Sequence, residues 1–130
     1  MHRLMLEDNG MQNYVSAADC AKLLRMIYEG KCVNSTYSDK MLSILKDQYW
    51  HDLLPAGLPE GTLCAQKSGA LAGLSYGDVG IVYHADGPYI VCIICNDPIA
   101  DGVCTDEIGT ISGIIDGFMG QRNAELQYSN

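Results

Sequence analysis

Apolar residues recur with a helical spacing in two stretches of the N-terminal half of the chain. Between residues 13 and 30 they fall at i, i+3, i+4 and i+7 over three turns. Ser16 followed by Asp19 resembles a capping box, and Gly30 supplies a stop signal. The pattern therefore predicts a helix over 13–30, and a second, shorter helix is expected over 38–48.

After the second helix the spacing changes from helical to extended. Two prolines and two glycines within residues 55–61 end any helix and predict an ordered turn. The apolar runs that follow predict three strands, over 62–67, 78–84 and 89–95. Asp86-Gly87 is a tight-turn signal, so the last two strands are expected to form an antiparallel hairpin. Residues 68–77 are expected to connect the first strand to the second.

A final helix is expected over 105–119. One face of it carries four large apolar residues, Ile108, Ile111, Ile115 and Phe118. Glycines recur at every fourth position, 109, 113 and 117, and each costs about 1 kcal/mol relative to alanine in a helix. This cost predicts a close approach of the helix to another element, for which a sheet is favoured over a second helix.

The order of these elements predicts an α+β fold. We expect a three-stranded antiparallel sheet covered by the C-terminal helix, together with two N-terminal helices. Residues 1–130 would form a single partial domain, with a helical part at 13–48 and the sheet with its C-terminal helix at 62–122. Three strands and one covering helix make a thin layer, so the chain is expected to be part of something larger.

Composition and charge exclude several classes of function. The 130 residues are 48% apolar and carry a formal net charge of −8, which repels nucleic acids and anionic membrane surfaces. We therefore expect no nucleic-acid partner. No window approaches the roughly 20 consecutive apolar residues of a membrane span, and the first residues lack the apolar run of a signal peptide.

The cysteines and histidines are not spaced as a metal site. Six cysteines scattered among apolar neighbours are expected to be mostly buried, reduced thiols. Cys92 and Cys95 match the Cys-x-x-Cys spacing, but residues three apart on a strand point to opposite faces. None of the three histidines lies at ligand spacing from a cysteine or another histidine. We expect no metal and no cofactor.

The best candidate for a ligand-binding segment is Lys67-Ser68-Gly69-Ala70. It combines an ammonium, a hydroxyl and small residues where a strand is expected to leave the sheet. A carboxylate would be a natural ligand, although a solvated strand end followed by a glycine turn would give the same residues. In this order of elements, the tetrapeptide resembles the Lys-Thr/Ser-Gly motif of the class A β-lactamases and related penicillin-recognising serine hydrolases. The resemblance covers nearly the whole chain but only the C-terminal half of the family's fold.

The resemblance implies a role for each residue of this motif. Lys67 would supply positive potential at the carboxylate of a β-lactam or peptidoglycan-peptide-like substrate, and Ser68 would hydrogen-bond the same carboxylate. Gly69 would let the substrate lie along the strand. The N–H of Ala70 would be one of two oxyanion-hole donors, the other belonging to the nucleophile's own residue.

No catalytic residue can be assigned in this chain. Ser43 and Lys46 fit the family's Ser-x-x-Lys pattern, and residues 128–130 fit Tyr-x-Asn, but both lie at the wrong point in the chain order. Glu7 lies roughly where class A enzymes carry the glutamate that activates water, yet the spacing to the following Asn is not reproduced. Without that base, efficient β-lactam hydrolysis would be in doubt even for a longer parent protein.

The resemblance also implies that the strand at 89–95 has lost a neighbour, because the family pairs it with an N-terminal strand. An open edge seeks a partner, so we expect a homo-oligomer, or completion by a missing N-terminal half, through 89–95. Three hypotheses follow: an inert fragment of a penicillin-recognising hydrolase, a non-catalytic interaction module, or a small enzyme using Ser43 and Lys46. The family is extracytoplasmic, but the location of this chain stays open.

Overall fold

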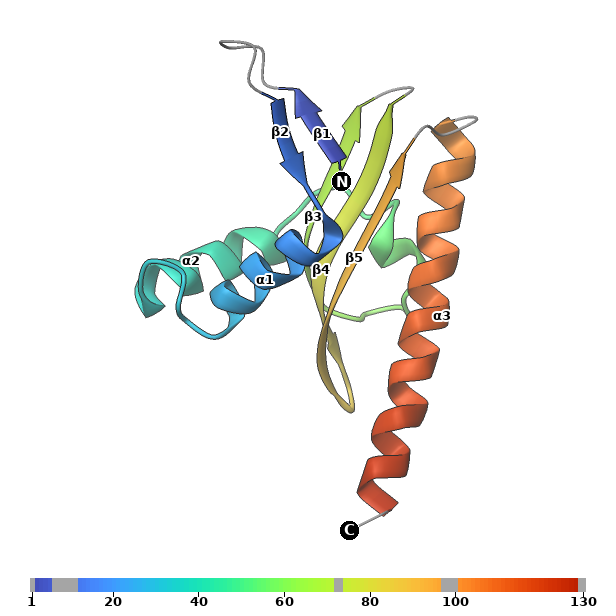
Figure 1. Ribbon diagram of the computed structural model, residues 1–130. Helices are drawn as coiled ribbons and strands as arrows, with labels where there is room; N and C mark the ends of the chain where they lie inside the picture. The colour runs from blue at the N-terminus through green and yellow to red at the C-terminus, as the bar shows by residue number, and fades with distance from the viewer. Residues whose placement is uncertain (1, 6–11, 72–73, 97–100, 129–130) are drawn as a thin grey trace.

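The computed structural model describes residues 2–5, 12–71, 74–96 and 101–128 (Figure 1). Its elements, in chain order, are β1 (His2–Met5), β2 (Gln12–Val15), α1 (Ala17–Tyr28), α2 (Ser35–Lys46), the 3₁₀ helix η1 (Leu54–Gly57), β3 (Cys64–Leu71), β4 (Ser75–His84), β5 (Gly87–Asn96) and α3 (Asp101–Tyr128). Within the described residues, none of the helices combines the length and apolar character that crossing a lipid bilayer requires.

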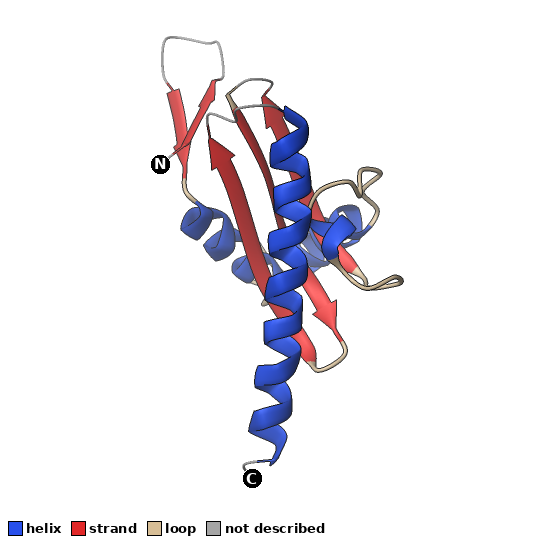
Figure 2. Cartoon of the chain, turned by 90° about the vertical axis from the view of Figure 1, so that its right-hand side faces the viewer, coloured by secondary structure: helices blue, strands red, loops and turns tan. Residues whose placement is uncertain are grey.

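The main sheet lies between two helical layers, which confirms the predicted α+β architecture. Its strand order is β3-β4-β5, and both pairs are antiparallel. On one face, Leu24 of α1 packs with Ala65 and Ile81 of the sheet. On the other, η1 and α3 cover a cluster around Leu54 and Val82. Figure 2 shows α3 lying along this second face and continuing past one end of the sheet.

The two N-terminal helices begin where polar side chains cap them. Ser16 and Asp19 form the predicted capping box, with the Asp19 N–H donating to Ser16 Oγ at 3.2 Å. The predicted helix boundaries need two corrections. Residues 12–15 form β2, which pairs with β1 instead of continuing the helix. The second helix begins at Ser35, three residues before the predicted start, because the Asn34 side chain accepts from the Tyr37 N–H.

The three predicted strands are present, but they are longer than the apolar runs. β3 continues through Leu71 and β4 begins at Ser75, so most of the predicted 68–77 connection is strand. The predicted β4–β5 hairpin is confirmed. His84 pairs with Gly87, so the two-residue loop of the hairpin is 85–86. The predicted turn, Asp86-Gly87, was one position later. Backbone hydrogen bonds thus extend the sheet into segments whose apolar pattern is weak.

The packed face of α3 differs from the predicted one. Ile108 is buried as expected, but Ile111 and Phe118 are 42% and 61% exposed. Polar residues take part in the buried face instead. Ser112 is buried, and Asp116 accepts from the Tyr89 hydroxyl at 2.8 Å. Ile115 also packs against the core, so the predicted face is right for Ile108 and Ile115 and wrong for Ile111 and Phe118.

The glycines of α3 allow a close approach, but to η1 and not to the sheet. A Cβ on Gly57 would lie 1.8 Å from the carbonyl oxygen of Gly109, so η1 and α3 touch backbone to backbone. Gly113 lies in the same contact, since a Cβ there would be 2.8 Å from the Gly57 oxygen. Gly117 has open space around it. The sheet that was favoured as the packing partner is thus replaced by a short helix.

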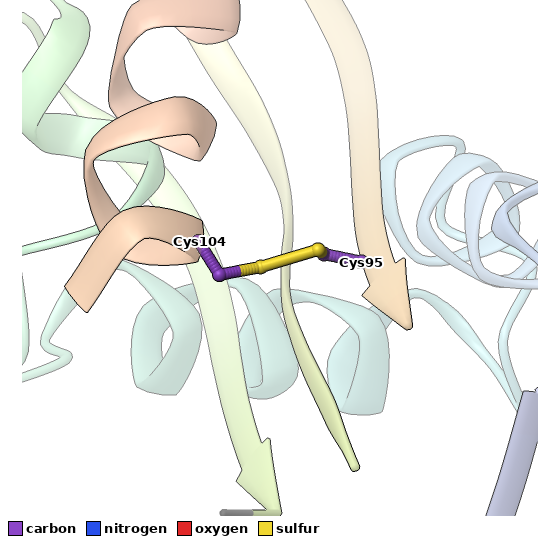
Figure 3. The surroundings of a disulfide bond; sticks show 2 residues. All are labelled: Cys95 and Cys104. Atoms are coloured by element: carbon purple, nitrogen blue, oxygen red, sulfur yellow. A yellow bond between two sulfur atoms is a disulfide. The ribbon is translucent and has the colours of Figure 1, made fainter. Parts of the chain in front are cut away.

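A disulfide joins Cys95 at the end of β5 to Cys104 near the start of α3 (Figure 3). Their Cα atoms are 6.8 Å apart. Cys92, three residues earlier, packs against the α1 side of the sheet, which confirms that the two cysteines of the Cys-x-x-Cys run point to opposite faces. Cys20, Cys32, Cys64 and Cys92 are free, as expected for most of the six cysteines, but of these four only Cys64 is buried. The bridge between Cys95 and Cys104 was not predicted.

Candidate functional site

The tetrapeptide at residues 67–70 lies within β3, at one margin of the main sheet. It was predicted where the strand leaves the sheet, but here it is paired with β4 along its whole length. Lys67 is exposed and Ser68 is half-buried. The Lys67 ammonium donates to the carbonyl oxygen of Ser68. The Lys67 charge therefore lies against the backbone of Ser68, at an accessible sheet edge.

The hydrogen-bond pattern shows which backbone groups this edge offers. The Tyr83 N–H donates to the Leu63 carbonyl at 2.9 Å, and these two residues continue the register that pairs β3 with β4. In antiparallel pairs, hydrogen-bonded and non-bonded residues alternate. The odd-numbered residues of β3 therefore bond to β4, and the even-numbered ones direct N–H and C=O away from it. The N–H groups of Ser68 and Ala70 point to the outer edge of β3.

Gly69 keeps the approach to this edge open. A Cβ built on it would meet nothing within 4 Å, so the strand is unobstructed between Ser68 and Ala70. Together the residues offer a cation, a hydroxyl and an outward N–H in a row along one strand. Such a row can bind a carboxylate at one end and polarise a carbonyl at the other, which is the chemistry of an oxyanion-binding wall.

A buried carboxylate, which the sequence analysis missed, lies directly across from the site. Asp78 of β4 is paired with Ser68 and is fully buried. Its Oδ2 accepts from the Leu54 N–H at 3.1 Å, which ties η1 to the sheet. Burial raises the pKa of Asp78 to about 6, although the Leu54 N–H and the nearby Lys67 charge oppose the shift. A lone acidic residue within an apolar strand pattern was the available signal.

The other candidate residues do not join this site. Ser43 lies exposed on α2, and the ammonium of Lys46 lies 4.4 Å from the centre of the Tyr83 ring. The hypothesis of a small enzyme using Ser43 and Lys46 therefore gains no support from these contacts. Glu7 and the last two residues of the Tyr-x-Asn match at 128–130 lie outside the described residues.

Comparisons with known proteins identify the family and the fold. The model of the β-lactamase enzyme family matches residues 1–116. No curated protein sequence gives a significant match. Among solved structures, PBP-A is similar over 79% of this chain and 39% of its own, with 28% identity and a TM-score of 0.73.

Two further solved structures share the fold at lower identity. A β-lactamase from Sphaerobacter thermophilus is 22% identical, with a TM-score of 0.72, over 85% of this chain and 42% of its own. A β-lactamase from Chitinophaga pinensis is 22% identical, with a TM-score of 0.74, over 82% and 43%. This chain thus spans about two-fifths of the length of these structures. With the family model matching nearly all of its sequence, the chain belongs to the β-lactamase enzyme family.

Proposed function

We propose that this chain supplies the substrate-binding wall of a penicillin-recognising serine hydrolase. The outward Ala70 N–H beside Lys67 and Ser68 on an open strand carries the proposal. Lys67 and Ser68 would hold the carboxylate of a β-lactam or a peptidoglycan-peptide-like substrate, and Ala70 would donate to the acyl oxygen. A solved structure of a PBP-A mutant, an acyl-enzyme complex with penicillin G, makes a β-lactam the substrate class of choice.

In this proposal, the nucleophile comes from polypeptide outside residues 1–130. The serine would attack the lactam carbonyl, and its proton would pass to a base while the lactam C–N bond breaks and the nitrogen is protonated. This chain contributes binding and polarisation only, so we expect the chain by itself to bind but not to be acylated. The exposed position of Ser43 and the contact of Lys46 with Tyr83 support this division of roles.

Benzylpenicillin binding to the 130-residue chain tests the proposal. We expect two-dimensional NMR to show shifts at the amides of 67–70, and Lys67→Ala to weaken binding by about tenfold or more because a charge-assisted contact is lost. Lys22→Ala, which removes a lysine from the exposed side of α1, is the matched control. Shifts elsewhere only, or binding insensitive to Lys67, would contradict the proposal. Covalent labelling of the chain alone by a fluorescent penicillin would instead favour Ser43.

We also propose that β5 pairs with a further strand. The alternation that exposes Ala70 on β3 places the even-numbered residues of β5 on its outer edge, including Ile90, Cys92 and Ile94. Exposed apolar side chains of α3 lie beside this outer edge of β5. Ile111 and Phe118 follow Cys104 at intervals of seven residues and so lie on its side of the helix, next to β5. In a solution of this chain alone, the partner would be a second copy.

Proline substitutions separate this edge pairing from folding. Ile94→Pro removes an outward N–H that β4 does not use, so we expect the fold to persist while the dimer dissociates. Ile93→Pro removes a hydrogen bond to β4 and should destabilise the sheet itself. Sedimentation measures the first effect and circular dichroism the second. A wild-type chain that stays monomeric at tens of micromolar would contradict the pairing, and with it the interaction-module alternative.

A further inference from the structure

An exposed aromatic pair lies on the segment that joins α2 to η1. Tyr49 is 85% exposed and Trp50 is 62% exposed. Their rings are in edge-to-face contact, with centres 5.3 Å apart. Side chains of this size normally bury most of their surface, and two adjacent exposed ones provide a large, rigid apolar contact area.

The topology places this pair at the outer edge of β3. α2 contacts the face of the sheet that α1 covers, whereas η1 lies on the opposite face, so the segment between them must pass around a sheet edge (Figure 1). A hydrogen bond from Gln66 Nε2 to the Trp50 carbonyl, at 2.5 Å, fixes the crossing point on β3. Gln66 itself is buried. The aromatic pair is therefore tethered one residue before Lys67.

The position of the aromatic pair at the Gln66 end of the tetrapeptide determines which end of a bound ligand would face it. Along the outer edge of β3, the tether at Gln66 comes first, the charge and hydroxyl of residues 67–68 follow, and the Ala70 N–H is last. A ligand with its carboxylate at Lys67 and its acyl oxygen at Ala70 therefore has its carboxylate end toward Trp50. A substituent on that end would meet the aromatic pair, and the acyl side chain would extend the opposite way.

We propose that Tyr49 and Trp50 form a platform for a planar apolar substituent at the carboxylate end of the ligand. The inference rests on the proposed function, since it takes the position of the carboxylate from Lys67 and Ser68. It adds a preference within the β-lactam class: cephalosporins with an aromatic group on the ring carbon next to the carboxylate-bearing carbon would be favoured over those with a methyl group there. The contact would be edge or face stacking with one or both rings.

Two cephalosporins that share one acyl side chain test this preference. One carries a styryl group and the other a methyl group on that ring carbon, and both are titrated into the full 130-residue chain. Trp50 is the single tryptophan of the sequence, so its indole N–H signal in NMR reports on the platform alone. We expect the styryl compound to bind about three- to tenfold more tightly and to shift this signal. Trp50→Ala should abolish the preference, and Tyr37→Ala, which removes an exposed aromatic side chain from α2, should preserve it.

The outcomes separate this inference from the function on which it rests. Equal binding of the two compounds, with Lys67→Ala weakening both, would overturn the platform and leave the proposed function standing. Absence of binding by either compound would overturn the proposed function and the platform with it. A preference for the styryl compound that survives Trp50→Ala and Tyr49→Ala would also overturn the platform.

Discussion

Replacing Gly57 with alanine is expected to destabilise the folded chain by about 3 kcal/mol or more. The added Cβ would lie 1.8 Å from the Gly109 oxygen and 2.9 Å from the Gly113 nitrogen, and both are backbone atoms that no side-chain rotation can move. η1 would therefore have to separate from α3. Because the Leu54 N–H donates to Asp78, that separation would also strain the link to β4 across from Ser68. Urea denaturation followed by circular dichroism measures the loss.

Other glycines of α3 provide the controls. A Cβ on Gly117 meets nothing within 4 Å, so Gly117→Ala should stabilise the helix by about 0.5–1 kcal/mol. A Cβ on Gly109 would lie 3.5 Å from the nearest atom, which is an ordinary contact, so Gly109→Ala should be tolerated. A urea midpoint for Gly57→Ala equal to that of the wild type would show that the backbone contact between η1 and α3 does not exist in solution.

The elements could be predicted from the sequence wherever a local signal determines them. The Ser16 capping box and the β4–β5 hairpin depend on neighbours in sequence, and both were predicted. β1 and β2 were missed because four-residue strands carry too little pattern for sequence-based prediction. The buried face of α3 was predicted only in part. Ile108 and Ile115 do face the core, and the glycine spacing did indicate a close approach, but no local signal identified η1 as the partner.

The candidate site could be predicted as a motif but not as a geometry. Residues 67–70 were identified from their types and order. Their position inside a paired strand, and hence the outward direction of the Ala70 N–H, follows from hydrogen-bond alternation that only the register reveals. The pairing of Asp78 with Ser68 and the hydrogen bond from Gln66 to Trp50 each join residues that are 10 or more positions apart, and no local pattern predicts such contacts.

Asp78 is a buried ionisable group next to the strand that carries the site, and its surroundings favour its protonated form. Its Oδ1 and the Gln66 Oε1 are both buried acceptors without a hydrogen-bond partner among the described residues. They lie on the same face of neighbouring strands, because Ser68 is opposite Asp78 and Gln66 is two residues before Ser68. A protonated Asp78 brings a donor to this group of acceptors and removes a buried charge. Both effects favour the protonated carboxyl in the folded state.

Asp78→Asn is therefore expected to change the pH dependence of stability. The pKa of Asp78 is raised by burial from 3.8 to about 6, so the folded chain binds the proton more tightly than the unfolded chain. The proton on Asp78 therefore stabilises the folded state of the wild type. This contribution is fully present below pH 4 and is lost as the pH rises through 6, for a total of up to about 3 kcal/mol. Asparagine carries no charge at any pH and can still accept from Leu54. Relative to the wild type, the variant should gain up to about 3 kcal/mol of stability between pH 4 and pH 7.5.

Urea titrations of both proteins at several pH values measure this difference directly. Taking the variant against the wild type at each pH cancels the contributions of other carboxylates, such as Glu29, whose pKa is lowered to about 2 by its hydrogen bonds with Arg25 and Lys31. Asp39→Asn, at an exposed position of α2, is the matched control and should show no such trend. A constant difference between pH 4 and 7.5 would mean that Asp78 ionises as freely in the folded chain as in the unfolded one. In that case the protonation of Asp78 would not be coupled to the stability of the fold.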